Sequence, residues 1–206
     1  MGADNSPSGW LLLLAQLPST PSSARVALWR RLRAIGATTI VNSAWVLPDS
    51  APHADFLGQL RETIGRQGGT GFVLNVPGSP AEMNQAIVRS FRSDRAREYD
   101  EFAERSTAFL EEVGKESRAE KYTFAEMEEN EQDLEKLTRW LAKIQARDFF
   151  PDKRGQQAAA MLARCREALN GFSQAVYIAE GVQEMPDGVT RPPATPESTG
   201  TDVGQS

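Results

Sequence analysis

The sequence predicts an α+β protein, in which a ferredoxin-like βαββαβ sheet is followed by a three-helix, mostly antiparallel helical annex. Apolar, strand-like runs alternate with amphipathic helical segments in the first part of the chain, and the part that follows has helical periodicity alone. The predicted divisions are a disordered lead-in (1–8), a ferredoxin-like α/β domain (9–79), a helical domain (80–182) and a disordered tail (183–206).

The run Trp10–Leu17 is apolar at successive positions, which is typical of a central strand with both faces covered. A helix is expected from about Ser22 to Ile35, because Leu28, Leu32 and Ile35 form an apolar stripe and Gly36 ends it.

The next segment, Thr38–Leu47, fits a strand or a tight strand pair with a bulge or bend at Asn42-Ser43. A helix over about Pro52–Gln67 and a strand over Gly71–Val76 complete the βαββαβ order. A plain two-layer fold leaves one sheet face in water, yet the first strand is apolar on both faces. We therefore expect the helical annex or a partner subunit to cover the second face.

The annex begins at Ser79-Pro80-Ala81-Glu82, which combines a capping serine, a proline at the first helical position and an early glutamate. One long helix is expected from Pro80 to about Lys115. A second capping box, Thr123–Glu126, opens another helix, and a third is expected over about Gln156–Glu180.

Charge is unevenly distributed in a chain whose formal net charge is −5. Residues 1–79 carry six Arg and four acids, whereas residues 119–150 carry five bases and eight acids. This pattern leaves room for a local basic patch and argues against a strongly basic nucleic-acid groove.

The scarcity of cysteine and histidine and the absence of known sequence motifs exclude several classes of site. With one cysteine and one histidine, the chain forms no internal disulfide and no Cys/His zinc site. No stretch approaches the roughly 20 apolar residues that span a membrane. P-loop, dinucleotide-binding and hydrolase-elbow motifs are also missing. We expect a cytoplasmic protein that is not an enzyme and has no cofactor and no metal.

The strongest binding candidates are four arginines of the first helix, which would contact DNA phosphate or another anion. They are Arg25, Arg30, Arg31 and Arg33. The alternative is an ordinary solvated helix face. A second cluster, Arg89–Arg97, has acids close by and is expected to form ion pairs along its own helix.

Cys165 is flanked by Arg164 and Arg166, which would favour a redox-sensitive thiolate. Its position on an apolar stripe instead favours a small buried core residue. The acidic run Glu126–Asp133 is interpreted as the solvated face of a helix, because it lacks a ligand-bearing loop.

Several separate motifs, in the same order, resemble the N-terminal domain of ChrB, a bacterial chromate-resistance protein described as a chromate-responsive transcriptional regulator. The front motifs are Trp10–Pro18, Leu28–Leu32, Gly36-Ala37 and Asn42–Pro48, and those of the annex are Tyr122–Glu126, Asp133–Leu137, Trp140 and Arg147–Phe150. The front half is similar, more distantly, to the central domain of the repressor PaaX and to the small CRISPR adaptation endonuclease. That nuclease family places an acidic metal ligand where this chain has Gln16–Ser19, which argues against nuclease activity.

The resemblance implies a regulator that forms a homodimer through its sheet and binds DNA. The alternative is a non-enzymatic interaction module that docks a separate ChrB C-terminal-type domain protein or a transporter. Full-length ChrB continues into such a C-terminal domain, whereas here the corresponding region is expected to be a disordered tail.

Overall fold

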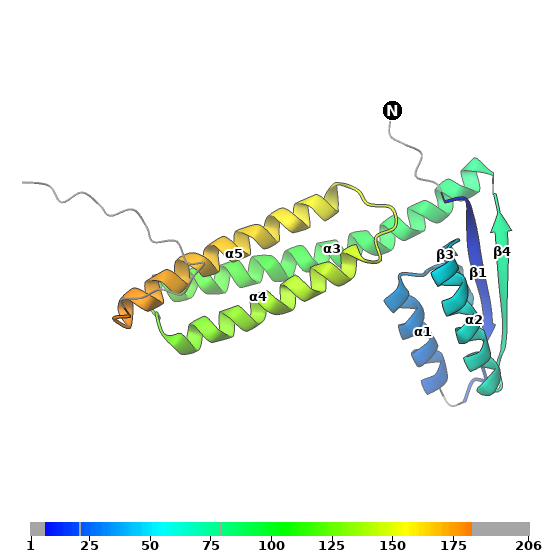
Figure 1. Cartoon of the computed structure of the whole chain (residues 1–206), viewed down its shortest axis with the longest axis horizontal. Helices are drawn as coiled ribbons and strands as arrows, with labels where there is room; N and C mark the ends of the chain where they lie inside the picture. Colours follow the sequence, from blue (N-terminus) through cyan, green and yellow to red (C-terminus); the bar gives the residue numbers. More distant parts are fainter. Residues whose placement is uncertain (1–6, 21, 79, 183–206) are drawn as a thin grey trace, which may run out of the picture.

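The computed structural model describes residues 7–20, 22–78 and 80–182. It confirms the predicted α+β class, since a four-stranded antiparallel sheet is followed by a bundle of long helices (Figure 1). Most of the predicted lead-in (1–6), the predicted cap Ser79 and the predicted tail (183–206) lie outside the described residues.

The first six elements follow the ferredoxin-like order, and the sheet order is β2-β3-β1-β4 with antiparallel neighbours. The elements are β1 (Gly9–Gln16), α1 (Ser23–Ile35), β2 (Thr38–Val41), β3 (Ala44–Pro48), α2 (Ala51–Arg66) and β4 (Thr70–Pro77).

As predicted, β1 is a central strand, paired with β3 on one side and β4 on the other. Leu11 and Leu13 point to the face that α1 and α2 cover, where both are almost fully buried. Trp10 points to the opposite face and is equally buried. The apolar run therefore reflects a strand that contributes to two separate cores.

The segment Thr38–Leu47 forms a strand pair, which was one of the two predicted readings. Ser43 adopts a positive φ of 70° in the turn between β2 and β3. Its carbonyl oxygen accepts a hydrogen bond from the backbone N–H of Ala15, at 3.1 Å. The turn is thus tied to the central strand.

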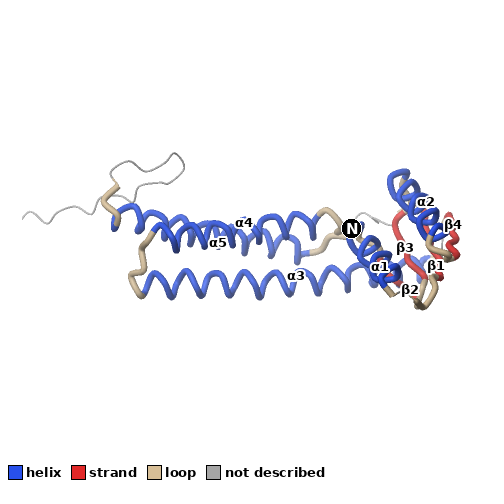
Figure 2. Tube along the Cα trace, turned by 90° about the horizontal axis from the view of Figure 1, so that it is seen from below, coloured by secondary structure: helices blue, strands red, loops and turns tan. Residues whose placement is uncertain are grey.

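The annex consists of α3 (Ala81–Arg118), α4 (Phe124–Gln145) and α5 (Lys153–Ala179). Figure 2 shows the three helices running alongside one another, away from the sheet. The predicted cap of α4 is confirmed, because the Thr123 hydroxyl accepts a hydrogen bond from the N–H of Glu126. The bundle core includes Phe102, Leu141 and Cys165.

The annex covers part of the second sheet face, as the apolar character of β1 required. Trp10 stacks on Phe91 of α3, with ring centroids 5.9 Å apart and planes inclined by 14°. Phe149 and Phe150, in the connection between α4 and α5, complete this aromatic cluster. The connection had been expected to link two helices, and it proves to be part of the core.

Helix α3 belongs to two cores. Ile87 and Phe91 pack against the sheet, whereas Phe102 and Phe109 pack within the bundle. The division of the chain at residues 79 and 80 stays a prediction. Among the described residues, none of the helices has the length and apolar character needed to cross a membrane.

Gly36 gives a test of how closely the two parts are packed. It ends α1 with a φ of +89°, and a Cβ there would lie 2.7 Å from Cβ of Arg147 and 3.1 Å from the Phe149 ring. We expect Gly36→Ala to lower the free energy of unfolding by about 2 kcal/mol, from strain and steric overlap. Urea unfolding followed by circular dichroism measures the change.

Gly58→Ala is the matched control, because a Cβ at this position of α2 meets no atom within 4 Å. Higher helix propensity should make it neutral or stabilising, by up to about 1 kcal/mol. Equal effects of the two substitutions would contradict the packing described for Gly36.

Candidate functional site

Three of the four predicted arginines of α1, Arg25, Arg30 and Arg31, are exposed to solvent. The 3.6-residue helical period places Arg30 on the side of α1 away from buried Leu32. Arg25 donates a hydrogen bond to the carbonyl oxygen of Ser19, at 3.0 Å. The guanidinium of Arg31 lies 5.6 Å from the centre of the Phe56 ring, on α2. In the part of the chain that the structure describes, none of the three forms an ion pair with an acid.

Arg33 differs from the other three because it turns towards α3. Its guanidinium lies 2.9 Å from Asp94 and 3.8 Å from Glu98. Asp94 also accepts a hydrogen bond from the hydroxyl of Thr38, at 2.8 Å. The structure therefore separates Arg33, which ties the sheet to α3, from the exposed arginines.

Glu98 is the centre of this charged junction. Besides Arg33, it is approached by Arg95 at 3.2 Å and by Arg147, which donates a hydrogen bond to it at 3.1 Å. Arg95 is 3% exposed, and this burial lowers its pKa against the opposing effect of Glu98. Nη1 of Arg95 nears Glu98 without hydrogen-bond geometry, and the Nε groups of Arg95 and Arg147 are buried without an acceptor. With Arg97, which lies 4.0 Å from Asp94, four guanidinium groups share the carboxylates of Asp94 and Glu98.

A hollow of about 580 Å³ lies beside this junction, between α1, the β2–β3 hairpin and α3. Its polar lining includes the hydroxyl groups of Ser90 and Ser93 and the guanidinium groups of Arg33 and Arg97. Asp94 also lines it and lies within 4.0 Å of both arginines. One carboxylate therefore faces two guanidinium groups, and the lining of the hollow keeps a net positive charge.

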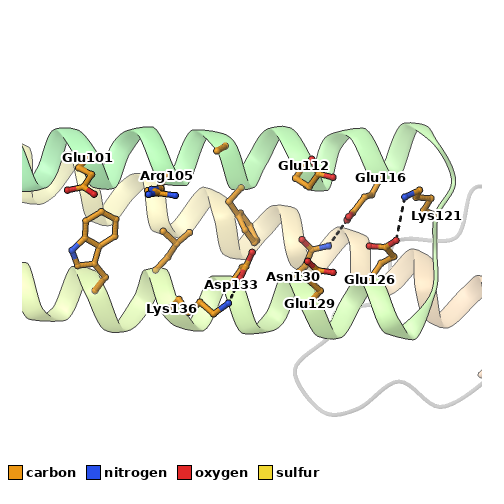
Figure 3. Close-up of a pocket in the computed structure, with 14 residues that line it drawn as sticks. Glu101, Arg105, Glu112, Glu116, Lys121, Glu126, Glu129, Asn130, Asp133 and Lys136 are labelled. Atoms are coloured by element: carbon orange, nitrogen blue, oxygen red, sulfur yellow. Dashed lines mark hydrogen bonds and ion pairs between the residues drawn. The ribbon is translucent and has the colours of Figure 1, made fainter.

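A second, acidic hollow of about 700 Å³ lies between α3 and α4 (Figure 3). Asn130 is buried and donates a hydrogen bond to Glu116 at 2.6 Å, while Trp140 and Phe109 add apolar lining. The charged lining residues are Glu101, Glu112, Glu116, Glu126, Glu129 and Asp133, with Arg105, Lys121 and Lys136. Half of the run Glu126–Asp133, predicted to be solvated, thus faces this groove. Within the described ranges, no group of His, Cys, Asp and Glu side chains is arranged to hold a metal ion.

The comparisons with known proteins support the resemblance seen in the sequence. Residues 25–183 match the family described as Protein ChrB, N-terminal. The chain belongs to this family. A relative from Cupriavidus metallidurans, named Protein ChrB, is 30% identical over 95 residues, which make up 46% of this chain and 29% of the relative. The aligned stretch therefore spans less than a third of that protein.

The ChrB N-terminal match begins in α1 and extends just past α5. It includes the exposed arginines, the charged junction and the acidic groove. The motif Trp10–Pro18, in and after β1, precedes the matched residues, although β1 is the central strand of the sheet.

Cys165 lies inside the helical bundle of this ChrB-family chain. Its side chain is fully buried, and its thiol donates a hydrogen bond to the carbonyl oxygen of Ser106, at 3.6 Å. Burial raises the pKa of the thiol, and the effect of nearby Arg164 is smaller. A buried thiol with a raised pKa is a weak nucleophile at neutral pH, so the geometry favours the core reading over the redox reading.

His53, the single histidine, lies in the first turn of α2 and is half-buried. Its Nδ1 lies 2.8 Å from the carbonyl oxygen of Pro48, and its ring meets the Phe149 ring edge-on at 5.2 Å. The helix start predicted for this residue was right. The tertiary contact with Phe149 depends on a segment almost a hundred residues away, which local sequence does not reveal.

The charged junction predicts a specific loss of stability. Glu98→Gln keeps the shape of the side chain and removes the charge that Arg33, Arg95 and Arg147 share. Because a buried guanidinium is then left uncompensated, the free energy of unfolding should fall by about 3 kcal/mol.

Glu112→Gln is the control, since Glu112 forms an exposed pair with Lys115 on the same helix. Its effect should stay within about 0.5 kcal/mol. Urea unfolding of both variants measures the difference, and a similarly small effect of Glu98→Gln would show that the junction contributes little.

Glu116 predicts a pH dependence. Its burial raises the pKa of the carboxyl group, with Glu126 adding to the shift and the hydrogen bond from Asn130 opposing it. A folded-state pKa above the unfolded value means that stability is lost as pH rises from the unfolded value, about 4.3, through the folded one. Glu116→Gln keeps an acceptor for Asn130 without the charge.

We therefore expect Glu116→Gln to stabilise the protein at pH 7 and to have little effect near pH 4. Urea unfolding at both pH values measures this. Glu111→Gln, at an exposed position of α3, should show no such pH-dependent gain. A loss of stability at pH 7 in Glu116→Gln would contradict the proposed cause.

Proposed function

We propose that this chain is a regulatory protein of bacterial chromate resistance that binds DNA through the exposed arginines of α1. Membership of the ChrB N-terminal family supports the link to chromate resistance, because the family resemblance implies a chromate-responsive regulator. The proposal includes a homodimer and needs no catalytic residue and no cofactor.

The observation that carries the proposal is that Arg25, Arg30 and Arg31 of α1 form no ion pair with any acid among the described residues. Arg30 points away from the buried Leu32, and Arg31 lies about 100° further around the helix, towards α2. Arg25 is in the exposed first turn, on the Leu32 side of α1, where it donates to the carbonyl oxygen of Ser19. Exposed guanidinium groups on a helix can bind phosphate oxygens through charge-assisted hydrogen bonds.

The distribution of charge gives DNA a preferred side of the molecule. The described sheet unit carries six arginines against Asp49, Asp55 and Glu62. The groove of the annex is lined by six acids and three bases. Repulsion of phosphate by the annex and attraction by α1 would therefore orient a duplex against the outer face of α1.

A second candidate is an interaction module that docks a separate ChrB C-terminal-type domain protein. The aligned stretch covers less than a third of the ChrB relative, and apolar side chains on the sheet are exposed. This candidate predicts that the chain has no affinity for DNA.

Fluorescence anisotropy with the DNA upstream of the protein's own gene tests the proposal, at about 50 and 200 mM salt and with and without chromate. Specific binding that chromate releases is the expected result. Replacing Arg30 and Arg31 by Ala should weaken binding about tenfold or more and reduce the slope of log affinity against log salt by about 2.

The control removes the same charge from α5, by Arg164→Ala with Arg166→Ala, both at exposed positions. This variant should bind DNA as the unmodified chain does. No binding by the unmodified chain at the lower salt concentration would rule out the regulator in favour of the interaction module.

A further inference from the structure

Only half of the second sheet face is covered by the annex. Near the start of β1, Trp10 is 1% exposed beneath Phe91 and Phe150. Towards the end of β1, large apolar side chains remain in solvent. We call these side chains the open half-face: Leu14 (36% exposed), Val41 (64%), Phe72 (58%) and Leu74 (45%).

The strand register shows that the open half-face is continuous. Leu14 on β1 is paired with Phe72 on β4, and Leu12 is paired with Leu74. On the other side, Ala44 of β3 pairs with both Leu14 and Val41. Directly paired side chains lie about 5 Å apart on the same face of a sheet. The exposed residues therefore lie on β1, β2 and β4 and are joined across β3 by Ala44, which is itself buried.

This face carries no charged side chain on its three longest strands. Its residues are Trp10, Leu12, Leu14 and Gln16 on β1, Ala44, Val46 and Pro48 on β3, and Thr70, Phe72, Leu74 and Val76 on β4. An antiparallel sheet with a face in water normally alternates apolar and polar residues. The exposed part of this face has the composition of a covered one.

We propose that a second copy of this chain covers the open half-face, with the two sheets packed face to face about a two-fold axis close to Phe72 and Leu74. In a two-fold interface each side chain near the axis meets its own copy, so a charge there would repel itself. A face without acids or bases is compatible with this symmetry.

The position of α3 favours the same arrangement. A packed helix and a packed sheet both lie roughly 10 Å from the sheet they cover. Figure 1 shows α3 crossing only one end of the strands. In the proposed dimer the second sheet lies beside α3, at the same height, over the other end. The two-fold axis then places the partner's α3 at the opposite end, where it does not overlap the first.

The inference deepens the proposed function, since it names the surface of the proposed homodimer. It leaves α1 exposed, because α1 covers the other face of the sheet. Association is measured without DNA, so failure of DNA binding and failure of this dimer are distinct results.

Sedimentation equilibrium of the full chain over a dilution series tests the inference. The unmodified chain should be a dimer at about 100 µM and dissociate on dilution. Phe72→Lys should raise the dimer dissociation constant about 100-fold or more, because two ammonium groups then meet at the axis. Because Phe72 is more than half exposed, the thermal unfolding of the Phe72→Lys variant should differ little from that of the unmodified chain. Leu74→Lys is a second variant with the same expected effect.

The control is Ile178→Lys, the same kind of change at a 68% exposed apolar residue of α5, far from the sheet along the chain. It should leave the dimer intact. A monomeric unmodified chain at 100 µM, or a dimer that persists in both Phe72→Lys and Leu74→Lys, would overturn the inference. The dimer would also persist in both variants if the copies paired edge to edge through β4, because main-chain groups make the contacts there.

A mixing experiment tests whether Phe72 faces its own copy across a two-fold axis or contacts some other part of the partner chain. Phe72→Glu alone should be monomeric for the same reason as Phe72→Lys. Mixed in equal amounts, the two variants should form a heterodimer, since opposite charges now meet across the axis. If both variants dissociate the dimer and their mixture remains monomeric, Phe72 does not lie beside its own copy and the proposed axis is wrong.

Discussion

The arrangement of this molecule depends on one helix being buried at both of its ends. α3 contributes Ile87 and Phe91 to the sheet and continues into the bundle through Phe102 and Phe109. Phe149 and Phe150, in the α4–α5 connection at the end of the bundle next to the sheet, close the same aromatic cluster around Trp10. Two stretches of the annex thus cover the start of the apolar first strand, around Trp10, whereas its second half, at Leu14, remains exposed.

The charged junction lies between these two cores and follows from the same packing. Arg33 reaches Asp94 because α1 ends beside α3, and Arg147 reaches Glu98 because the α4–α5 connection folds back onto the sheet. Burial makes each of these groups dependent on the others, whereas the Glu112–Lys115 pair further along α3 is exposed. The ion pairs at the junction thus fix how α1, α3 and the α4–α5 connection are oriented, while burial of apolar area supplies most of the stabilisation.

Much of the fold could be predicted from local pattern, and the missing parts were those that depend on distant residues. The order of strands and helices followed from apolar periodicity, from Gly36 and from the Thr123 cap. The need for a cover on the second face followed from Trp10–Leu17. The core role of Phe149-Phe150 gave no periodic signal, because it lies in a connection. Likewise, the sequence grouped Arg33 with its neighbours, and only the structure shows that Asp94, some sixty residues later, removes it from the exposed set.

Helix α3 runs without interruption from the sheet to the far end of the bundle. From Arg95 to the end of the helix at Arg118 the distance is about 35 Å, at 1.5 Å per residue. A rotation of about 5° at the junction would displace the far end of the bundle by about 3 Å. No linker intervenes within α3 to absorb such a rotation. Helix α3 therefore links the Glu98 junction to the far end of the bundle, where a small change of angle at the junction corresponds to a larger displacement.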